Sequence, residues 1–301
     1  MIEKTLKKPH ELLIYEALLS RIPFSKKEES YFHNLKLGYE GEEKFEQLLK
    51  EKIDDQFIVI SDLWLEVHTT TFQIDSILLT GDTLCFFDVK NYPGNYIHAE
   101  KRWYKLPQKE INNPLLQLKR NETLMRQILL ELNVDLAVDS YDVFINPEFT
   151  LYQAPVNKQL IFPTQIPKFI KELVAKPPIT SLQHSLAKQL IARDLGKYPH
   201  PRIPTYEYHQ LTKGFRCGKC CRLTVYIEGR NCVCSKCQQV EPVHGALLQN
   251  IEELRLLFPD KKLTTNLVYD WCGGGYSKKS IKRFLEKNFR SVGTHKWVYY
   301  L

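Results

Sequence analysis

The 301-residue sequence has no apolar run near the roughly 18 residues that would span a bilayer. The first residues, MIEKTLKKPHELLIYEALL, lack a small-residue cleavage site after an apolar stretch, so no secretory signal is expected. Internal repeats and low-complexity tracts are also absent. These absences exclude a repeat array and predict a soluble, cytoplasmic protein with no membrane partner.

Hydrophobic residues make up 43% of the chain, enough for a substantial core and, at ordinary domain size, for about two or three domains. The formal net charge of +7 is a mild excess. It is compatible with a polyanionic partner but does not demonstrate one, so the positions of the charges matter more than their sum.

Apolar periodicity predicts the order helix, three strands, helix, two strands, helix over residues 33–175. The first helix follows a charged break, PFSKKEESYFHN, and the second begins at Pro114. Such an order predicts an α/β fold with a mixed central sheet flanked by helices. We expect five segments: a helical extension at 1–32, the α/β domain at 33–175, a helical piece and Pro-rich linker at 176–209, a cysteine module at 210–243 and a basic helical module at 244–301.

The stretch QIDSILLTGDTLCFFDVK places charge inside two apolar strands. Gly81 and Asp82 predict a two-residue hairpin turn, with a positive φ at the glycine. In that register Asp75 lies opposite Asp88, and alternation puts both on one face with Lys90. Opposed like charges destabilise a sheet unless something compensates them. A hard divalent cation, Mg²⁺ or Mn²⁺, would do so.

A plainer interpretation also fits this stretch, namely an ordinary hairpin whose charges face solvent, with Lys90 in a salt bridge. Glu42 weighs against it, because this carboxylate lies on the apolar stripe of its helix, three residues before Phe45. An inward carboxylate needs a partner. Glu42, Asp75, Asp88 and Lys90 would therefore converge on one face of the sheet.

These residues resemble the core of PD-(D/E)XK nucleases. The stretches GYEGEEKFEQLL, QIDSILLTGDTLCFFDVKNYPGNY and NNPLLQLKRN, with Trp103, are similar to the nuclease-related domain (NERD) family over about residues 33–175. The chain departs from that family at Asp88, where the family usually has glutamate. The resemblance implies a restriction-endonuclease-like fold and Mg²⁺-dependent hydrolysis of phosphodiester bonds in DNA.

Residue roles follow from the same resemblance. Asp75 and Asp88 would hold Mg²⁺ (or Mn²⁺), with Glu42 as a further ligand, and Lys90 would orient the attacking water. Gln117 matches the family's helix glutamine after a proline, and its alternative is a solvated helix residue. The implied catalytic set is thus Glu42, Asp75, Asp88, Lys90 and Gln117.

Two Cys-x-x-Cys pairs flank a strand-like segment in FRCGKCCRLTVYIEGRNCVCSKCQQ. Four thiolates at this spacing suit tetrahedral Zn²⁺ and are similar to a zinc ribbon, where a closed site is structural. Cys221 and Cys232 leave the ligand set open, and a redox dithiol or free thiols are the alternatives. The set that keeps both two-residue gaps is Cys217, Cys220, Cys234 and Cys237.

The C-terminal stretch combines a helix, a Gly-rich turn, a basic helix capped by Ser277 and a closing two-strand segment around Gly293. This order resembles a helix-turn-helix with a wing, which would dock on DNA phosphates. A small helical module with a solvated lysine face is the alternative. The outward cations are Lys278, Lys279, Lys282, Arg283 and Lys287.

Three hypotheses follow from the whole sequence. The first is a Mg²⁺-dependent DNA nuclease that two small modules bring to DNA. The second is a non-catalytic adaptor that binds DNA or a protein partner on a nuclease-like platform. The third is a zinc-dependent regulator driven by the tail, in which the hairpin acids are dispensable.

Overall fold

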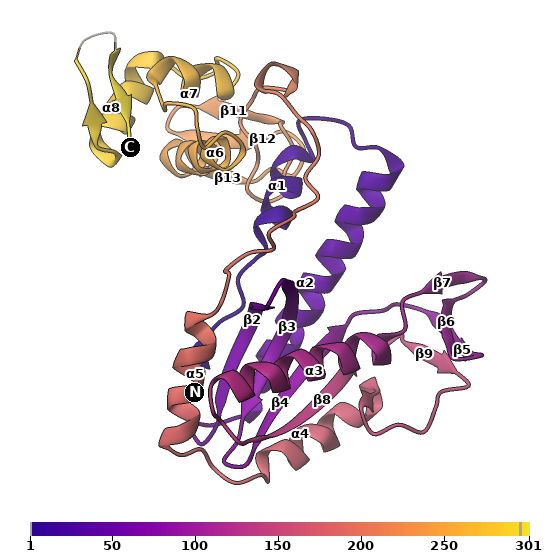
Figure 1. Cartoon of the computed structure of the whole chain (residues 1–301). Coiled ribbons are helices and arrows are strands. Elements are labelled where there is room, and N and C mark those ends of the chain that lie inside the picture. The colour runs from indigo at the N-terminus through magenta and orange to yellow at the C-terminus, as the bar shows by residue number, and fades with distance from the viewer. Residues whose placement is uncertain (1, 295–296) are drawn as a thin grey trace. The chain divides into compact units, whose positions relative to one another are not determined.

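The computed structural model describes residues 2–294 and 297–301, and it contains two compact units (Figure 1). Unit 1 comprises residues 2–9 and 33–200, and unit 2 comprises the described part of 10–32 and 201–301. This division differs from the five segments expected from sequence, because residues 10–32 pack with the C-terminal part of the chain. No helix in the described residues is both long and apolar enough to cross a membrane. The cytoplasmic location stays a prediction.

Unit 1 is built on a six-stranded mixed sheet with the strand order β1-β2-β3-β4-β8-β10. The central β2, β3 and β4 are antiparallel, whereas β1, β8 and β10 run parallel to their neighbours. The predicted mixed sheet is therefore confirmed. The strands are β1 Ile2–Lys4, β2 Ile58–Val67, β3 Thr70–Leu79, β4 Thr83–Lys90, β8 Ala137–Phe144 and β10 Leu160–Ile161.

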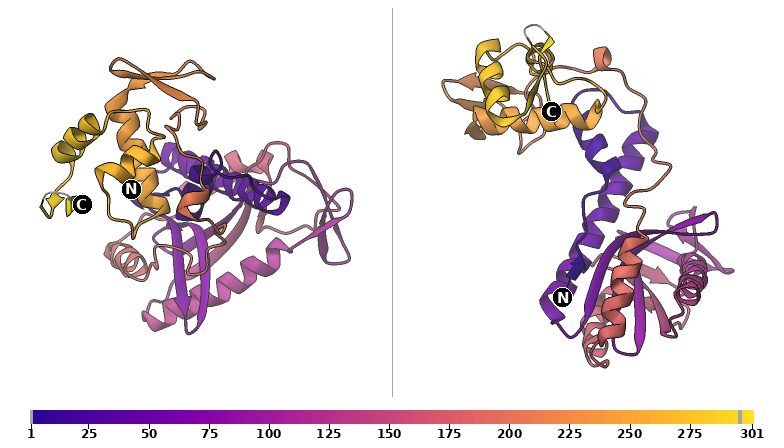
Figure 2. Two further views of the ribbon diagram at one scale, coloured as in Figure 1. Left: turned by 90° about the horizontal axis from the view of Figure 1, so that it is seen from above. Right: turned by 60° about the vertical axis from the view of Figure 1, so that its left-hand side comes forward.

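Helices cover both faces of this sheet (Figures 1 and 2). Leu118 of α3 and Leu186 of α5 join one apolar cluster with the strands. Phe45 of α2 and Phe169 of α4 join the cluster on the opposite face. These three layers are what the predicted α/β class requires. The four helices are α2 Lys26–Lys52, α3 Pro114–Glu131, α4 Ile166–Val174 and α5 Ser181–Ala192.

The β3–β4 hairpin has the predicted register, with Leu79 opposite Leu84 and the Thr80 N–H donating to the Thr83 carbonyl at 3.0 Å. The positive φ expected at Gly81 is wrong, since this glycine is not in the left-handed region. Glycine is required there for space. An added Cβ would lie 2.3 Å from the Pro178 carbonyl oxygen.

The charged break expected before the first domain helix is also wrong, because α2 is continuous from Lys26. Its start is fixed by reciprocal hydrogen bonds. The Ser25 N–H donates to Glu28 Oε2 at 2.8 Å, and the Glu28 N–H donates to Ser25 Oγ at 3.3 Å. This is a capping box, and its Ser-x-x-Glu signature is visible in the sequence.

A second, four-stranded sheet in unit 1 has the order β7-β6-β5-β9 and lies where the sequence analysis assigned no strand. Its strands surround an aromatic cluster in which Trp103 stacks on Phe144 with centroids 5.8 Å apart. Aromatic packing holds short strands that have little periodicity of their own. They are β5 Asn95–Ala99, β6 Arg102–Lys105, β7 Lys109–Ile111 and β9 Thr150–Tyr152.

Unit 2 has a single apolar core to which α1, the cysteine module and the C-terminal helices all contribute. Arg21, after α1, is buried; its Nε donates to Glu253 at 2.6 Å and its guanidinium lies 3.8 Å from the Trp271 ring centroid. This buried ion pair explains why residues 10–32 belong to unit 2. The elements are α1 His10–Leu18, α6 Val243–Leu257, α7 Thr265–Trp271, α8 Lys278–Asn288, and strands β11 Val225–Glu228, β12 Asn231–Cys234, β13 Val240–Pro242, β14 Ser291–Val292 and β15 Tyr299–Tyr300.

Replacing either of two glycines in α2 by alanine should change the stability of the fold in opposite directions. A Cβ at Gly41 would lie 2.6 Å from Asn91 Cβ, whereas at Gly38 it would meet nothing within 4 Å. We expect Gly41→Ala to lower the unfolding free energy by about 1 to 3 kcal/mol through overpacking. Gly38→Ala should raise it by about 0.5 to 1 kcal/mol. Denaturant unfolding of both variants checks this, and equal effects would contradict the close approach of α2 to Asn91, the residue that follows β4.

Candidate active site

Strands β3 and β4 separate at Asp75. Their ladder ends at the pair Ser76–Phe87, and the next backbone donor, the Val89 N–H, bonds instead to Asp75 Oδ2 at 2.7 Å. The alternation of β3 breaks here too, because Ile74 and Ile77 join the same cluster. In the predicted register Asp75 would lie opposite Asp88, but the two residues form no backbone ladder pair. The Asp75 side chain bridges the gap between the two strands.

Four aspartates from adjacent strands lie in one row across the sheet. The β2–β3 register places Asp62 level with Asp75, and the β3–β4 register continues from Asp75 to Asp88. In the parallel β4–β8 ladder, Asp88 pairs with Asp142. Asp62 interrupts β2 with a φ of 52°. The sequence predicted only the two central members of this row.

Lys90 is the buried cation of the site. Its Nζ donates to Asp88 Oδ1 at 2.7 Å and to Gln117 Oε1 at 3.3 Å. Burial alone would lower the pKa of the ammonium, but Asp88, and after it Tyr92, Asp142 and Asp75, hold that pKa above its ordinary value. Lys90 therefore stays charged. Asp88 Oδ2 is buried and has no hydrogen-bond partner among the described residues.

Glu42 comes from α2, at the point where Gly41 packs closely on Asn91. Burial, followed by the charges of Asp62 and Asp88, raises the pKa of Glu42 to about 7. Burial and the charges of Glu42 and Asp88 likewise raise the pKa of Asp75 well above its ordinary value. The charges of Glu42 and Asp88 thus both contribute, after burial, to the raised pKa of Asp75.

Asp142 was missed by sequence reasoning. It is 0% exposed, and both its carboxylate oxygens lack a hydrogen-bond partner within the described chain. Burial and then Asp88 raise its pKa to about 8. The available signal was one carboxylate inside the apolar run YDVF, which gains meaning only once β8 is known to lie beside β4.

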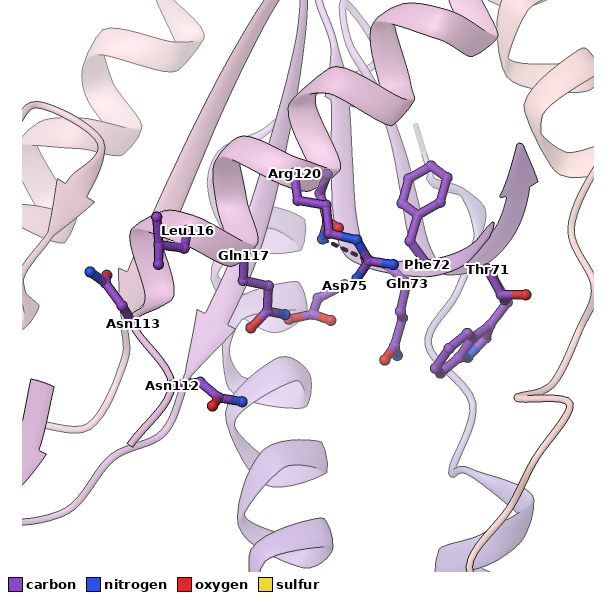
Figure 3. A pocket seen from close by; sticks show the side chains of 11 residues that line it. Thr71, Phe72, Gln73, Asp75, Asn112, Asn113, Leu116, Gln117 and Arg120 are labelled. Carbon is purple, nitrogen blue, oxygen red and sulfur yellow. Dashed lines mark hydrogen bonds between the residues drawn. The ribbon is translucent and has the colours of Figure 1, made fainter. Parts of the chain in front are cut away.

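A pocket of about 560 Å³ opens beside Asp75 (Figure 3). Figure 3 shows Asp75 and Gln117 pointing toward one another, with Arg120 reaching in from the same helix as Gln117. Asn121 is committed to the fold, because its amide donates to the Gln73 carbonyl at 3.2 Å. Trp64 lines the pocket as well. The pocket thus offers amide, guanidinium and aromatic groups next to an acidic site.

Carboxylate oxygens suit a hard divalent cation, and the orphaned Asp88 Oδ2 fits such a ligand. The carboxylates are less tightly gathered than the thiols of unit 2. Among the described residues, the four cysteines are the one group of three or more potential ligands whose donor atoms all lie within 4.8 Å of one another. The wider spacing of the carboxylates is expected, because like charges repel one another when no cation lies between them.

The cysteine cluster of unit 2 consists of the four residues of the two Cys-x-x-Cys pairs, and it can hold a metal ion. Cys217 and Cys237 have their sulfurs 3.6 Å apart. Cys232 instead lies in the apolar core. Cys221 has a φ of 56° in the turn after the first pair. The chain that leads from the first pair into the second forms β11 and β12, and β13, which follows the second pair, completes the sheet.

The C-terminal helix α8 has an apolar face buried through Ile281 and Leu285. Its five predicted DNA-binding cations are all exposed. Two of them also have partners within the chain, since Lys282 lies 3.7 Å from Glu286 and Lys278 lies over the Tyr269 ring. The remaining three are Lys279, Arg283 and Lys287.

The mixed sheet flanked by helices, with acids and one lysine where β3 and β4 separate, is consistent with a nuclease-like α/β fold. Residues 37–145, about a third of the chain, match the family model of the nuclease-related domain. The match confirms the sequence resemblance to that family over this part of the chain. No curated protein and no solved structure matches the chain.

The raised carboxyl pKa values predict a pH dependence. In the folded state Glu42 stays protonated up to about pH 7 and Asp142 up to about pH 8. In the unfolded chain the same carboxyl groups lose their protons near pH 4 to 5. Folded protein therefore binds more protons across this window, so its stability should fall as pH rises from about 5 to 8. Thermal unfolding without added divalent cation measures this.

Matched variants identify the source of that slope. Glu42→Gln should flatten it, whereas Glu43→Gln, a change at the exposed neighbour, should not. Added Mg²⁺ should oppose the loss at high pH, because a cation binds the ionised carboxylates. A melting temperature that is constant or rises over the window would contradict the shifted carboxyl groups.

Proposed function

We propose that the chain is a divalent-cation-dependent nuclease that hydrolyses phosphodiester bonds in DNA. The observation that carries this proposal is the buried Lys90–Asp88 pair, with Lys90 held charged and one Asp88 oxygen left without a partner. An ordinary solvent-face hairpin would expose these groups. Here they are buried in a site that also contains Glu42 and Asp75.

Asp75 and Asp88 would hold Mg²⁺ or Mn²⁺, with Glu42 as a further ligand. The cation supplies activation of water and offsets charge on the attacked phosphate. Lys90 has a third N–H beyond its bonds to Asp88 and Gln117, and that donor can orient a water or a phosphate oxygen. Gln117 fixes the ammonium through its Oε1 and keeps its amide N–H groups for the substrate.

The pocket beside Asp75 suits the nucleotide next to the attacked phosphate. Arg120, exposed on α3 one turn after Gln117, is placed to pair with a backbone phosphate. The Trp64 indole offers a ring for base stacking. These groups would position the strand, and the acids would act on it.

Unit 2 would bring the domain to DNA. A structural Zn²⁺ in the four-thiol cluster would hold the ribbon together. The order α6, Leu263, α7, α8, β14, β15, with Leu263 bridging to Tyr300, fits a winged helix-turn-helix in which α8 reads DNA. Trp297, between β14 and β15, is exposed at the wing.

The direct test is cleavage of plasmid and linear DNA with Mg²⁺ or Mn²⁺. Asp75→Ala, Asp88→Ala and Lys90→Ala should each lower the rate at least about a hundredfold, because each removes a group that acts on the attacked phosphate. Asp135→Ala, at an exposed carboxylate before β8, serves as the matched control and should cut normally. Binding without cutting in every sample would support the adaptor hypothesis instead.

DNA affinity should depend on α8. Replacing Lys279 and Arg283 by alanine removes two exposed charges, so the slope of log K against log salt should decrease by about 2. The control replaces Lys168 and Lys171, two exposed lysines of α4, in the same way. Fluorescence anisotropy over a salt series gives both slopes, and equal slopes would remove α8 from the interface.

Zinc content separates the candidate ligands. We expect one Zn²⁺ per chain by elemental analysis, lost in Cys220→Ser and kept in Cys221→Ser, because only the former thiol lies in the four-sulfur cluster. Loss of this zinc should also lower the stability of unit 2, since metal and folding are coupled. Retention of zinc by Cys220→Ser would contradict this ligand set.

A further inference from the structure

Asp142 is a buried carboxyl group whose hydrogen-bonding capacity the described residues do not satisfy. Its side chain is wholly buried on β8, yet neither carboxylate oxygen has a hydrogen-bond partner in the described part of the chain. A buried carboxyl without a partner is costly in either protonation state. A ligand from outside the chain that bonds the carboxylate oxygens would remove this cost.

Polar side chains near Asp142 form their hydrogen bonds with other residues. Ser140, two residues earlier on the same face, donates to Glu122 at 2.9 Å and accepts from Gln159 at 2.8 Å. Lys90 donates to Asp88 and Gln117. Lys90 and Tyr92 lie near enough to interact electrostatically with Asp142, but no donor in the described residues bonds either of its oxygens.

The neighbour of Asp142 across the ladder is Asp88, the proposed metal ligand. Adjacent strands lie about 4.8 Å apart, so the two carboxyl groups share one face at neighbouring positions. Asp88 Oδ2 lacks a partner as well. Three orphaned carboxylate oxygens thus occur together on β4 and β8, and a hard cation is the ligand that satisfies several such oxygens at once.

We propose that Asp142 is a fourth acidic residue of the metal site, contributing to divalent-cation binding together with Asp88. This inference rests on the proposed metal-dependent function. It extends the three-acid set of Glu42, Asp75 and Asp88 by a residue on β8, which lies on the other side of β4 from Asp75. Asp142 would act on the cation and on the placement of Asp88, and not on the substrate.

The experiment is a calorimetric titration of the zinc-loaded full chain with Mn²⁺, in the absence of DNA. Asp142→Asn keeps the side-chain volume and removes the charge, so Mn²⁺ should bind about tenfold or more weakly. The control is Asp139→Asn on the same strand. Asp139 points to the other face, where it pairs with Lys176 at 3.1 Å, and its loss should leave Mn²⁺ affinity unchanged.

Asp142→Leu guards against a folding failure of the first variant, because it replaces the unpartnered group by an apolar one. It should also weaken Mn²⁺ binding. If either folded variant binds Mn²⁺ as tightly as the wild type does, while Asp75→Asn loses binding, the inference about Asp142 is overturned and the metal site stands. A wild type that binds no Mn²⁺ would overturn the proposed function as well.

Discussion

The hydrogen bond from the Val89 N–H to the Asp75 carboxylate is the contact on which the site depends. It takes the place of a ladder bond where β3 and β4 separate, and so it fixes a charged side chain between two strands that would otherwise close on each other. The separation leaves Asp88 and Lys90 at an opening in the sheet. α2 reaches this opening because Gly41 allows close packing on Asn91, and that approach positions Glu42.

Charge balance then limits what the site can be. Several carboxyl groups lie near one buried ammonium, and the pKa values of Glu42, Asp75 and Asp142 are all raised, first by burial and then by the charges of neighbouring carboxylates. Burying such a set without compensation destabilises the fold. A divalent cation would restore the balance by drawing these carboxylate oxygens together around it. The excess of buried carboxylates that destabilises the cation-free protein would therefore favour binding of a divalent cation.

The sequence predicted the features that depend on local spacing. The Gly81-Asp82 pair gave the hairpin register, and two Cys-x-x-Cys pairs indicated the cluster of four thiols. It did not predict Asp142 or Asp62, because a single charge in an apolar strand has no assignable partner until the strand order is known. The packing of residues 10–32 with the C-terminal part was missed for a similar reason. It depends on Arg21 meeting Glu253, which lies 232 residues further along the chain.

The measurement that tests the central claim most directly is anomalous diffraction at the manganese edge from crystals soaked in Mn²⁺, with the zinc signal as an internal reference. We predict a manganese peak in contact with Asp75 and Asp88, beside the Lys90 ammonium. Crystals that show zinc at the cysteine cluster but no manganese at the separated strands would contradict the account.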